Sequence, residues 1–417
     1  MAYRFQSSRE NRAVRATVNL LYPAVLAARE RVVRLAATPE DWRHLERLRG
    51  RPALLLPNHP SETEPSILVG VARRLNEPVH YVATHEMFEG FPGWLIRRMG
   101  AFSIRRGWPD RAALRTARHV LAERGRKLVV FPEGETHMRN DLILPLHKGA
   151  LQIGFWSLLR MEALGQHPSL PIVPLAIKYR FVGDARPELL RGVRRLETHL
   201  GLPAEPAAAP LEARLRRAGL AVLRGVEREY GVTVGVPAPT PSEEAAAIDA
   251  RIAVLYRYVA ERIARTLHVR VPEQPTVHLT MRALFNAAFD YRDGLSDGTG
   301  SYERRLHARR LRAADTCLRD LWRMQNFMAI DADCLTPPLT VERAGEVLFR
   351  LEKEVFGRPQ TRPWREAVIR VGPPLDLAER LPQYREGRKA ALAAATADVE
   401  ERLRGLLLSL RDVATPL

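Results

Sequence analysis

The chain is poor in cysteine. Cys317 and Cys334 are the only two among its 417 residues, so neither a disulfide framework nor a cysteine-based zinc site is indicated. The histidines do not fall at a spacing typical of a metal site either. We therefore expect a protein of a reducing compartment, the cytoplasm, that holds no metal.

Long apolar runs are missing as well. Near the N-terminus the longest uncharged run extends only from Ala16 to Ala28, which is too short to span a bilayer and contains Asn19 and Pro23. The same region lacks the apolar core and small-residue cleavage site of a secretory signal. No segment is predicted to cross a membrane, so any membrane contact is expected to be peripheral.

Lysine is also scarce, with five residues, yet the net charge is +17. The positive charge is therefore almost entirely arginine, which is spread along the whole chain. A basic surface favours an anionic partner such as membrane phospholipid. Nucleic acid is the weaker expectation, because zinc-finger spacing, a single-strand-binding pattern and a helix-turn-helix are all absent from the sequence.

What the chain does contain, between Pro52 and Tyr179, is a regular alternation of short apolar runs and helix-length patterns. This alternation is typical of an α/β core. Strands are expected at 53–56, 79–83, 102–104, 128–131 and 172–179. The helices expected between them cover 66–75, 91–99, 110–124 and 149–164.

The rest of the chain has a different character. Prolines and glycines from Pro187 to Pro210 predict a linker, and long helical patterns follow, divided by a loop at 292–300. One strand pattern returns at 366–377, followed by a helix at 384–410, and this late strand most simply rejoins the earlier sheet.

We therefore predict an α/β fold in which one mixed sheet is flanked by helices and carries a large all-helical insertion. The predicted parts are an N-terminal amphipathic helical segment at 1–49, the α/β core at 50–183, the helical insertion at 184–363, and a final strand and helix at 364–417. Within the first part, residues 10–35 alternate arginine with apolar residues at helical spacing. Such a stretch lies in a headgroup layer in some proteins and packs on its own domain in others.

The stretch from Leu54 to Pro65 contains a candidate catalytic pair. An apolar run of strand length ends in a turn that holds His59, and Glu64 follows five residues later. On one regular helix that spacing would place the side chains about 140° apart, so they meet only if Glu64 begins the next helix. There the carboxylate can accept a hydrogen bond from one ring nitrogen and leave the other free as a base. The alternative is an ordinary surface turn.

A second stretch, 100–107, places Arg105 and Arg106 at the end of a predicted strand. The guanidinium group matches the oxygens of phosphate or carboxylate, so these arginines are candidate ligands for an anion. Two solvated arginines at a strand terminus are the alternative.

Two more stretches follow this pattern. In 128–137, Gly134 permits a sharp turn whose backbone amides can approach an anion, and Glu133 can hold an arginine or a substrate hydroxyl. In 170–177, Pro174 interrupts a strand, as expected at a sheet edge or at a bulge that lines a site. Taken alone, each is equally compatible with a plain turn or edge strand.

Together and in this order, the four stretches resemble the glycerol-phosphate and lysophospholipid acyltransferase family. The matching blocks are Asn58-His59 through Glu64 for N-H-x-x-x-x-D, Gly100 to Arg106 for G-x-x-x-I-x-R, Phe131-Pro132-Glu133-Gly134 for F-P-E-G, and Val173 to Ile177 for V-P-V-A-I. The resemblance covers 50–180 and roughly 364–410, but not the helical region between them.

The resemblance implies an acyltransferase similar to 1-acylglycerol-3-phosphate O-acyltransferases, with acyl-CoA or acyl-ACP as donor and a lysophosphatidate-like acceptor. His59 would be the general base, oriented by Glu64. The residues expected to bind the acceptor or its phosphate are Arg106, Glu133, Gly134 and Arg139, and those expected to line the site are Asn58, Phe131, Pro132 and Pro174. No bound cofactor is implied, and the protein is expected on the inner face of the membrane.

Two departures from the family pattern keep other functions open. Glu64 stands where the family usually has Asp, and Glu135-Thr136-His137 follows F-P-E-G where a small residue and then arginine are common. A catalytically inactive, membrane-associated lipid-binding protein on the same fold is one alternative. A histidine-based hydrolase of lipid esters or thioesters is another.

Overall fold

The computed structural model describes residues 3–105, 110–204, 206, 209–232, 241–271, 277–293, 300–328 and 339–417. It contains two compact units. The sheet unit comprises Phe5–Gly183 and Pro363–Thr415. The helical unit comprises Asp184–Arg362 together with the chain ends before Phe5 and after Thr415.

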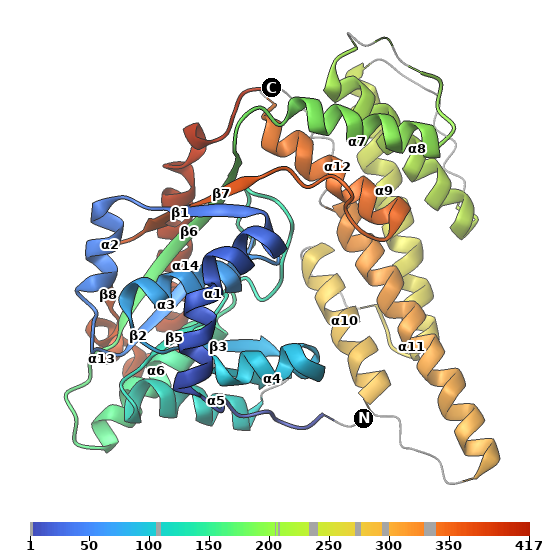
Figure 1. Ribbon diagram of the computed structural model, residues 1–417. Coiled ribbons are helices and arrows are strands. Elements are labelled where there is room, and N and C mark those ends of the chain that lie inside the picture. The colour runs from blue at the N-terminus through green and yellow to red at the C-terminus, as the bar shows by residue number, and fades with distance from the viewer. Residues whose placement is uncertain are drawn as a thin grey trace. The chain divides into compact units, whose positions relative to one another are not determined.

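The sheet unit is built on one mixed sheet, which has eight strands in the described residues (Figure 1). The strands are β1 (Val32–Ala36), β2 (Ala53–Pro57), β3 (Val79–Thr84), β4 (Ala101–Ile104), β5 (Lys127–Val129), β6 (Pro171–Phe181), β7 (Arg365–Val371) and β8 (Leu375–Asp376). Their order is β1-β7-β6-β2-β5-β3-β4, with β8 pairing β6. The five strands from β6 to β4 are parallel, whereas β7 runs antiparallel to β6.

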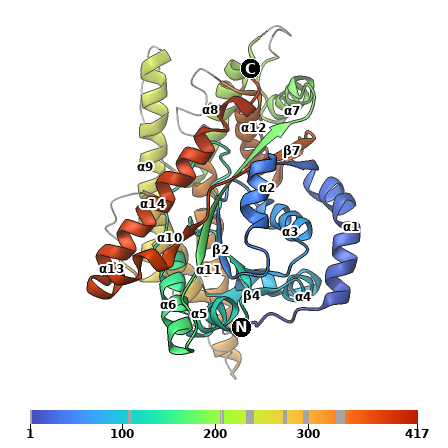
Figure 2. The same ribbon diagram turned by 90° about the vertical axis from the view of Figure 1, so that its left-hand side faces the viewer.

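Helices cover both faces of this sheet. They are α1 (Arg12–Glu30), α2 (Pro39–Glu46), α3 (Glu64–Leu75), α4 (Gly90–Arg98), α5 (Arg111–Arg118), α6 (Gly149–Ala163), α13 (Leu381–Glu386) and α14 (Arg388–Leu408). One buried apolar cluster joins the sheet to α1, α2 and α3, and a second joins it to α5, α6 and α14. Figure 2 shows α14 on the opposite side of the sheet from α2 and α3. The predicted α/β class is confirmed.

Strand β6 is longer than its parallel neighbour. Its register with β2 ends where Leu175 pairs with Pro57, but β6 continues to Phe181. Over this overhang it is paired with β7, from Leu175 opposite Val371 to Phe181 opposite Arg365. The overhang therefore extends beneath the turn that follows β2.

The late strand rejoins the sheet as expected, but one other expectation was wrong and another is narrowed. Val32–Ala36 is strand β1 rather than part of a helix reaching residue 35, and it pairs with β7. Pro174 lies in a strand with neighbours on both sides, so of its two expected positions, a sheet edge or a bulge, the edge is excluded. Proline has no N–H to donate. This is tolerated because Pro174 lies between the part of β6 that pairs with β7 and the part that pairs with β8.

The helical unit contains α7 (Arg186–His199), α8 (Leu211–Tyr230), α9 (Pro241–Leu267), α10 (Val277–Asp293), α11 (Ser301–Met328) and α12 (Val341–Phe356). Helix α7 replaces the first part of the expected linker, because Pro187 stands in the first helical turn, where proline is tolerated. The expected loop at 292–300 falls largely outside the described residues. Among the described helices, none combines the length and the apolar character needed to cross a membrane.

Candidate active site

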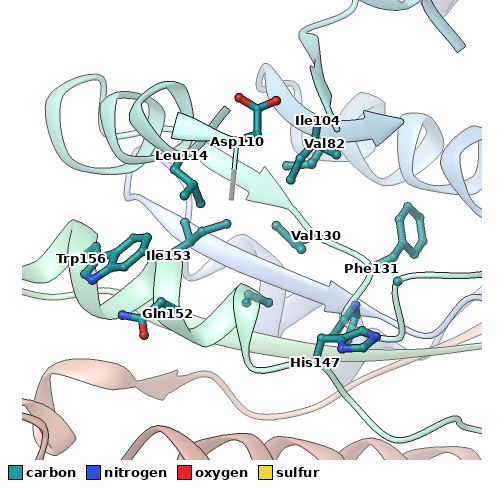
Figure 3. A pocket seen from close by; sticks show the side chains of 14 residues that line it. Val82, Ile104, Asp110, Leu114, Val130, Phe131, His147, Gln152, Ile153 and Trp156 are labelled. Atoms are coloured by element: carbon teal, nitrogen blue, oxygen red, sulfur yellow. The ribbon is translucent and has the colours of Figure 1, made fainter. Parts of the chain in front are cut away.

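A cavity of about 310 Å³ opens at the carboxyl ends of the parallel strands (Figure 3). Its lining is mainly apolar and comes from β3, β4, α5, α6 and the residues after β5; it includes Val82, Ile104, Leu114, Val130, Ile153 and Trp156. In α/β sheets, ligand sites occur at this end of the strands. The cavity is therefore placed to hold an apolar group beside whatever chemistry the adjoining turns provide.

Phe131 joins this cavity to His59. The Phe131 side chain lines the cavity, and its ring stacks on the imidazole of His59 with 4.0 Å between ring centroids. Pro132 and Gly134 line the same cavity. The F-P-E-G turn thus forms the wall between the apolar cavity and the histidine.

The turn after β2 is fixed to β6 through Asn58. The Asn58 side chain is fully buried, donates to the carbonyl of Ile177 at 3.0 Å and accepts from the Ile177 amide at 2.7 Å. A side-chain amide thereby continues the ladder between the two strands after β2 has ended. This brings His59 to a defined position above the β6 overhang.

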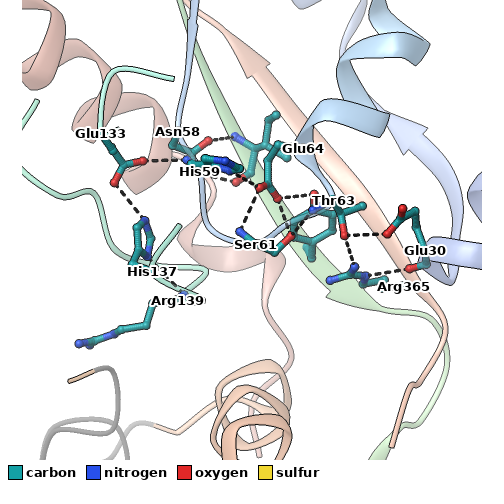
Figure 4. A network of polar contacts seen from close by, with 12 residues as sticks. Glu30, Asn58, His59, Ser61, Thr63, Glu64, Glu133, His137, Arg139 and Arg365 are labelled. Atoms are coloured by element: carbon teal, nitrogen blue, oxygen red, sulfur yellow. Dashed lines mark hydrogen bonds and ion pairs between the residues drawn. The ribbon is translucent and has the colours of Figure 1, made fainter. Parts of the chain in front are cut away.

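His59 and Glu64 meet directly (Figure 4). His59 Nδ1 lies 2.7 Å from Glu64 Oε2, and Glu64 is the first residue of α3. In the described part of the chain, no hydrogen bond engages His59 Nε2, and the side chain is 16% exposed. With the proton on Nδ1, Nε2 is a base with access to a ligand.

Glu64 is completely buried and accepts hydrogen bonds on both oxygens. Oε2 also accepts from the Ser61 amide at 3.0 Å, and Oε1 accepts from the hydroxyls of Ser61 and Tyr179, each at 2.6 Å. Four donors fill the capacity of a carboxylate. The geometry of this group, and through it of His59, is fixed by its surroundings.

These contacts determine the protonation states. Burial alone would raise the pKa of the Glu64 carboxyl, but the hydrogen bonds from His59, Ser61 and Tyr179 outweigh it and the pKa lies below its ordinary value. Burial, together with the Glu64 carboxylate, raises the pKa of Tyr179 well above 10. At neutral pH Glu64 is therefore an anion and Tyr179 a donor.

Glu133 braces the same histidine from the other side. Its Oε1 accepts from the main-chain amide of His59 at 2.7 Å, and its Oε2 accepts from the amide of Leu144 at 2.7 Å. His137 Nε2 lies 3.0 Å from the same Oε2. Glu133 is fully buried, so its contacts hold the F-P-E-G turn and the turn after β2 together.

The remaining predicted site residues differ in what they contact. Gly134 adopts a φ of 73°, which favours glycine, and its N–H donates to the carbonyl of Phe131. The Pro132 carbonyl accepts from the His147 amide, and Pro174 packs against Gly372. The side chain of Arg139 extends away from the His59–Glu64 pair (Figure 4). Arg106 lies outside the described residues.

Sequence reasoning missed Ser61, Tyr179 and the cavity. Ser61 was detectable, because it lies between His59 and Glu64 in a turn where serine commonly bonds the backbone. Tyr179 is 115 positions from Glu64, and no local pattern connects the two. The cavity arises from several elements that are separated in sequence.

Comparison with known proteins agrees with the resemblance. Residues 40–178 match the family model described as Acyltransferase. A lyso-ornithine lipid O-acyltransferase from Pseudomonas aeruginosa is 30% identical over 170 residues, which is 40% of this chain and 58% of that protein. The chain thus matches less than two thirds of the length of this relative.

Proposed function

We propose that this chain, whose residues 40–178 match the family model described as Acyltransferase, moves a fatty acyl group from an acyl thioester to a hydroxyl of a lysolipid. The observation that carries the proposal is the His59–Glu64 pair, in which a buried carboxylate holds Nδ1 and leaves Nε2 open. The donor would be acyl-CoA or acyl-ACP.

The reaction follows from the open nitrogen. Nε2 of His59 takes the proton of the acceptor hydroxyl as its oxygen attacks the thioester carbonyl carbon. The tetrahedral intermediate then collapses, the carbon–sulfur bond breaks, and the leaving thiolate takes the proton back from the imidazolium. The products are an ester and a free thiol. Glu64 stabilises the imidazolium while it exists.

The cavity supports an assignment for the acyl chain. It is lined mainly by apolar side chains, and one of them, Phe131, stacks on the ring of His59. An acyl chain in the cavity would place its thioester near the F-P-E-G turn. Burial of each methylene contributes about 0.8 kcal/mol, so donor affinity should rise with chain length until the cavity is full.

The acceptor headgroup has two candidate chemistries. Arg106 and Arg139 are the proposed ligands for the phosphate of a lysophosphatidate-like acceptor. The absence of arginine directly after the F-P-E-G block, and the name of the relative from Pseudomonas aeruginosa, favour a phosphate-free lysolipid such as a lyso-ornithine lipid as the second candidate.

A lipid acceptor calls for contact with a membrane, and exposed apolar residues support this. Leu20, Leu21 and Val25 of α1 are exposed, and so are Phe91 and Trp94 of α4. Because α1 also carries Arg12, Arg15 and Arg29, we propose that these helices contact an anionic membrane surface peripherally. Sedimentation with anionic vesicles tests this; absence of binding at low salt contradicts it.

The central test measures release of free thiol from a long-chain acyl-CoA or acyl-ACP. Lysophosphatidate, glycerol 3-phosphate and lyso-ornithine lipid are offered in turn as acceptors. Acceptor-dependent release is expected from the wild type and is expected to fall about 10²- to 10⁴-fold in His59→Ala.

A matched control is His119→Ala. His119 also places Nδ1 near a glutamate, Glu123, at 2.9 Å, but on an exposed helix surface. It should retain wild-type turnover. Thiol release that ignores the acceptor would favour the hydrolase alternative, and a folded protein with no turnover would favour the inactive lipid-binding protein.

A further inference from the structure

We infer that Tyr179 is a positioning residue for the reaction, acting on His59 through Glu64. This inference rests on the proposed function. Tyr179 touches neither His59 nor the cavity in the described contacts, but its hydroxyl donates to Glu64 Oε1 at 2.6 Å. It therefore controls the orientation of the carboxylate whose other oxygen holds the imidazole.

Tyr179 is itself held firmly on the overhang of β6. Its amide donates to the side-chain oxygen of Asn140 at 2.8 Å, and its carbonyl accepts from the Asn140 side chain. The guanidinium of Arg365, from the neighbouring β7, lies 4.4 Å from the centre of the tyrosine ring. Arg365 is in turn bonded to Thr63 at 2.6 Å, one residue before α3. The phenol is thus fixed by the sheet below the turn that it supports.

The length of the glutamate explains why such a support is needed. A glutamate has one more rotatable bond than an aspartate, so its carboxylate can turn away from His59 unless both oxygens are held. Ser61 contacts both oxygens, but it lies in the same turn as His59 and moves with it. Tyr179 is the donor that comes from a different element. It ties the carboxylate to the sheet.

Removing this donor should change catalysis in a specific way. In Tyr179→Phe the carboxylate loses one charge-assisted hydrogen bond and is no longer tied to the sheet, so it can turn away from His59. The imidazolium that forms during the reaction is then stabilised less well. We therefore expect kcat to fall about tenfold with KM unchanged.

The matched control is Tyr22→Phe. Tyr22 is also a buried tyrosine against α3, and its hydroxyl donates to the main-chain carbonyl of Ser66 at 3.0 Å, not to Glu64. Loss of the Tyr22 hydroxyl should lower thermal stability to a similar extent but leave kcat unchanged. Equal changes of kcat in both variants, or a wild-type kcat in Tyr179→Phe, would overturn the inference.

A double-mutant cycle with Glu64→Asp sharpens the test. The shorter side chain of aspartate withdraws the carboxylate from Tyr179. In the Glu64→Asp background, Tyr179→Phe should therefore change kcat by less than twofold. A full tenfold loss in the aspartate background would show that Tyr179 acts by another route and would contradict the inference.

An activity-independent measurement separates this inference from the proposed function. In protein labelled with ¹⁵N-histidine, the Nδ1 proton of His59 is identified by its absence in His59→Ala. Its NMR signal should shift in Tyr179→Phe and not in Tyr22→Phe. An unchanged signal overturns the role of Tyr179 even if the protein is an active acyltransferase. A shift in a protein with no turnover would support the contact while the proposed function fails.

Discussion

Glu64 in the sheet unit and Glu352 in the helical unit are both completely buried, and they are held by different kinds of donor. Glu352 accepts from Arg195 at 2.9 Å, from the Thr361 hydroxyl and from two main-chain amides. Glu64 accepts from an imidazole, two hydroxyls and one amide. Within the described residues, its hydrogen-bonding shell contains no arginine or lysine.

This difference bears on the proposed catalytic role of Glu64. The charge of Glu352 is matched permanently by a cation, so it stabilises the fold in every state of the protein. The charge of Glu64 is matched by a cation only when His59 takes up a proton. Its electrostatic stabilisation is therefore greatest at the moment when a general base is protonated, which is the condition for accelerating a reaction rather than only binding a substrate.

The largest expected effect is that of Glu64→Gln. The amide keeps the size of the side chain but cannot stabilise an imidazolium, so kcat should fall about 10²- to 10⁴-fold while the protein stays folded. Steady-state thiol release and circular dichroism would measure both. Wild-type turnover in this variant would contradict a catalytic role for Glu64, which would then be only a structural carboxylate.

Glu352→Gln should show the opposite pattern. It leaves Arg195 without its carboxylate and weakens the bonds to Thr361, so we expect a loss of about 2 kcal/mol in the free energy of unfolding. Urea denaturation measures this loss. The kcat of the folded fraction should stay within about twofold of the wild type, and a tenfold fall would contradict the assignment of Glu352 to stability alone.

Glu10 is an intermediate case, held by His80 Nε2 at 2.5 Å and Arg124 at 3.0 Å. The hydrogen bond from His80 is the largest influence and lowers the pKa of Glu10 to about 2. A lowered pKa means that the stabilisation is present above the unfolded value near 4.5 and is lost as the pH falls toward 2.

Glu10→Gln should therefore lower the free energy of unfolding by about 1 kcal/mol at pH 7, since water reaches the carboxylate. The difference from the wild type should shrink as unfolding is measured at lower pH. A difference that stays constant between pH 6 and pH 3 would show that the charge of Glu10 does not contribute. Because His80 bonds Gly100 through its other nitrogen, it is not available as a base, in contrast to His59.

The sheet from β2 to β6 was predictable because its strands are apolar runs between clear helical patterns. Strand β1 was not, since it follows the helix α1 after a single residue and only Val32 of its five residues is buried. The His59–Glu64 contact followed from spacing and from the requirement that Glu64 begin a helix. The contact with Tyr179 depends on how far β6 extends past β2, which is a property of the assembled sheet and not of either segment.

The overhang of β6 has a consequence for how the chain is made. Its partner β7 begins at Arg365, so residues 182–364 must be synthesised before the two strands can pair. At typical rates of synthesis this takes roughly 10 to 40 s. Strand β1 also pairs with β7, so it stays without this partner through the same interval. During translation the edge of β6 and the unpaired strand β1 therefore stay open to other chains until β7 has been made.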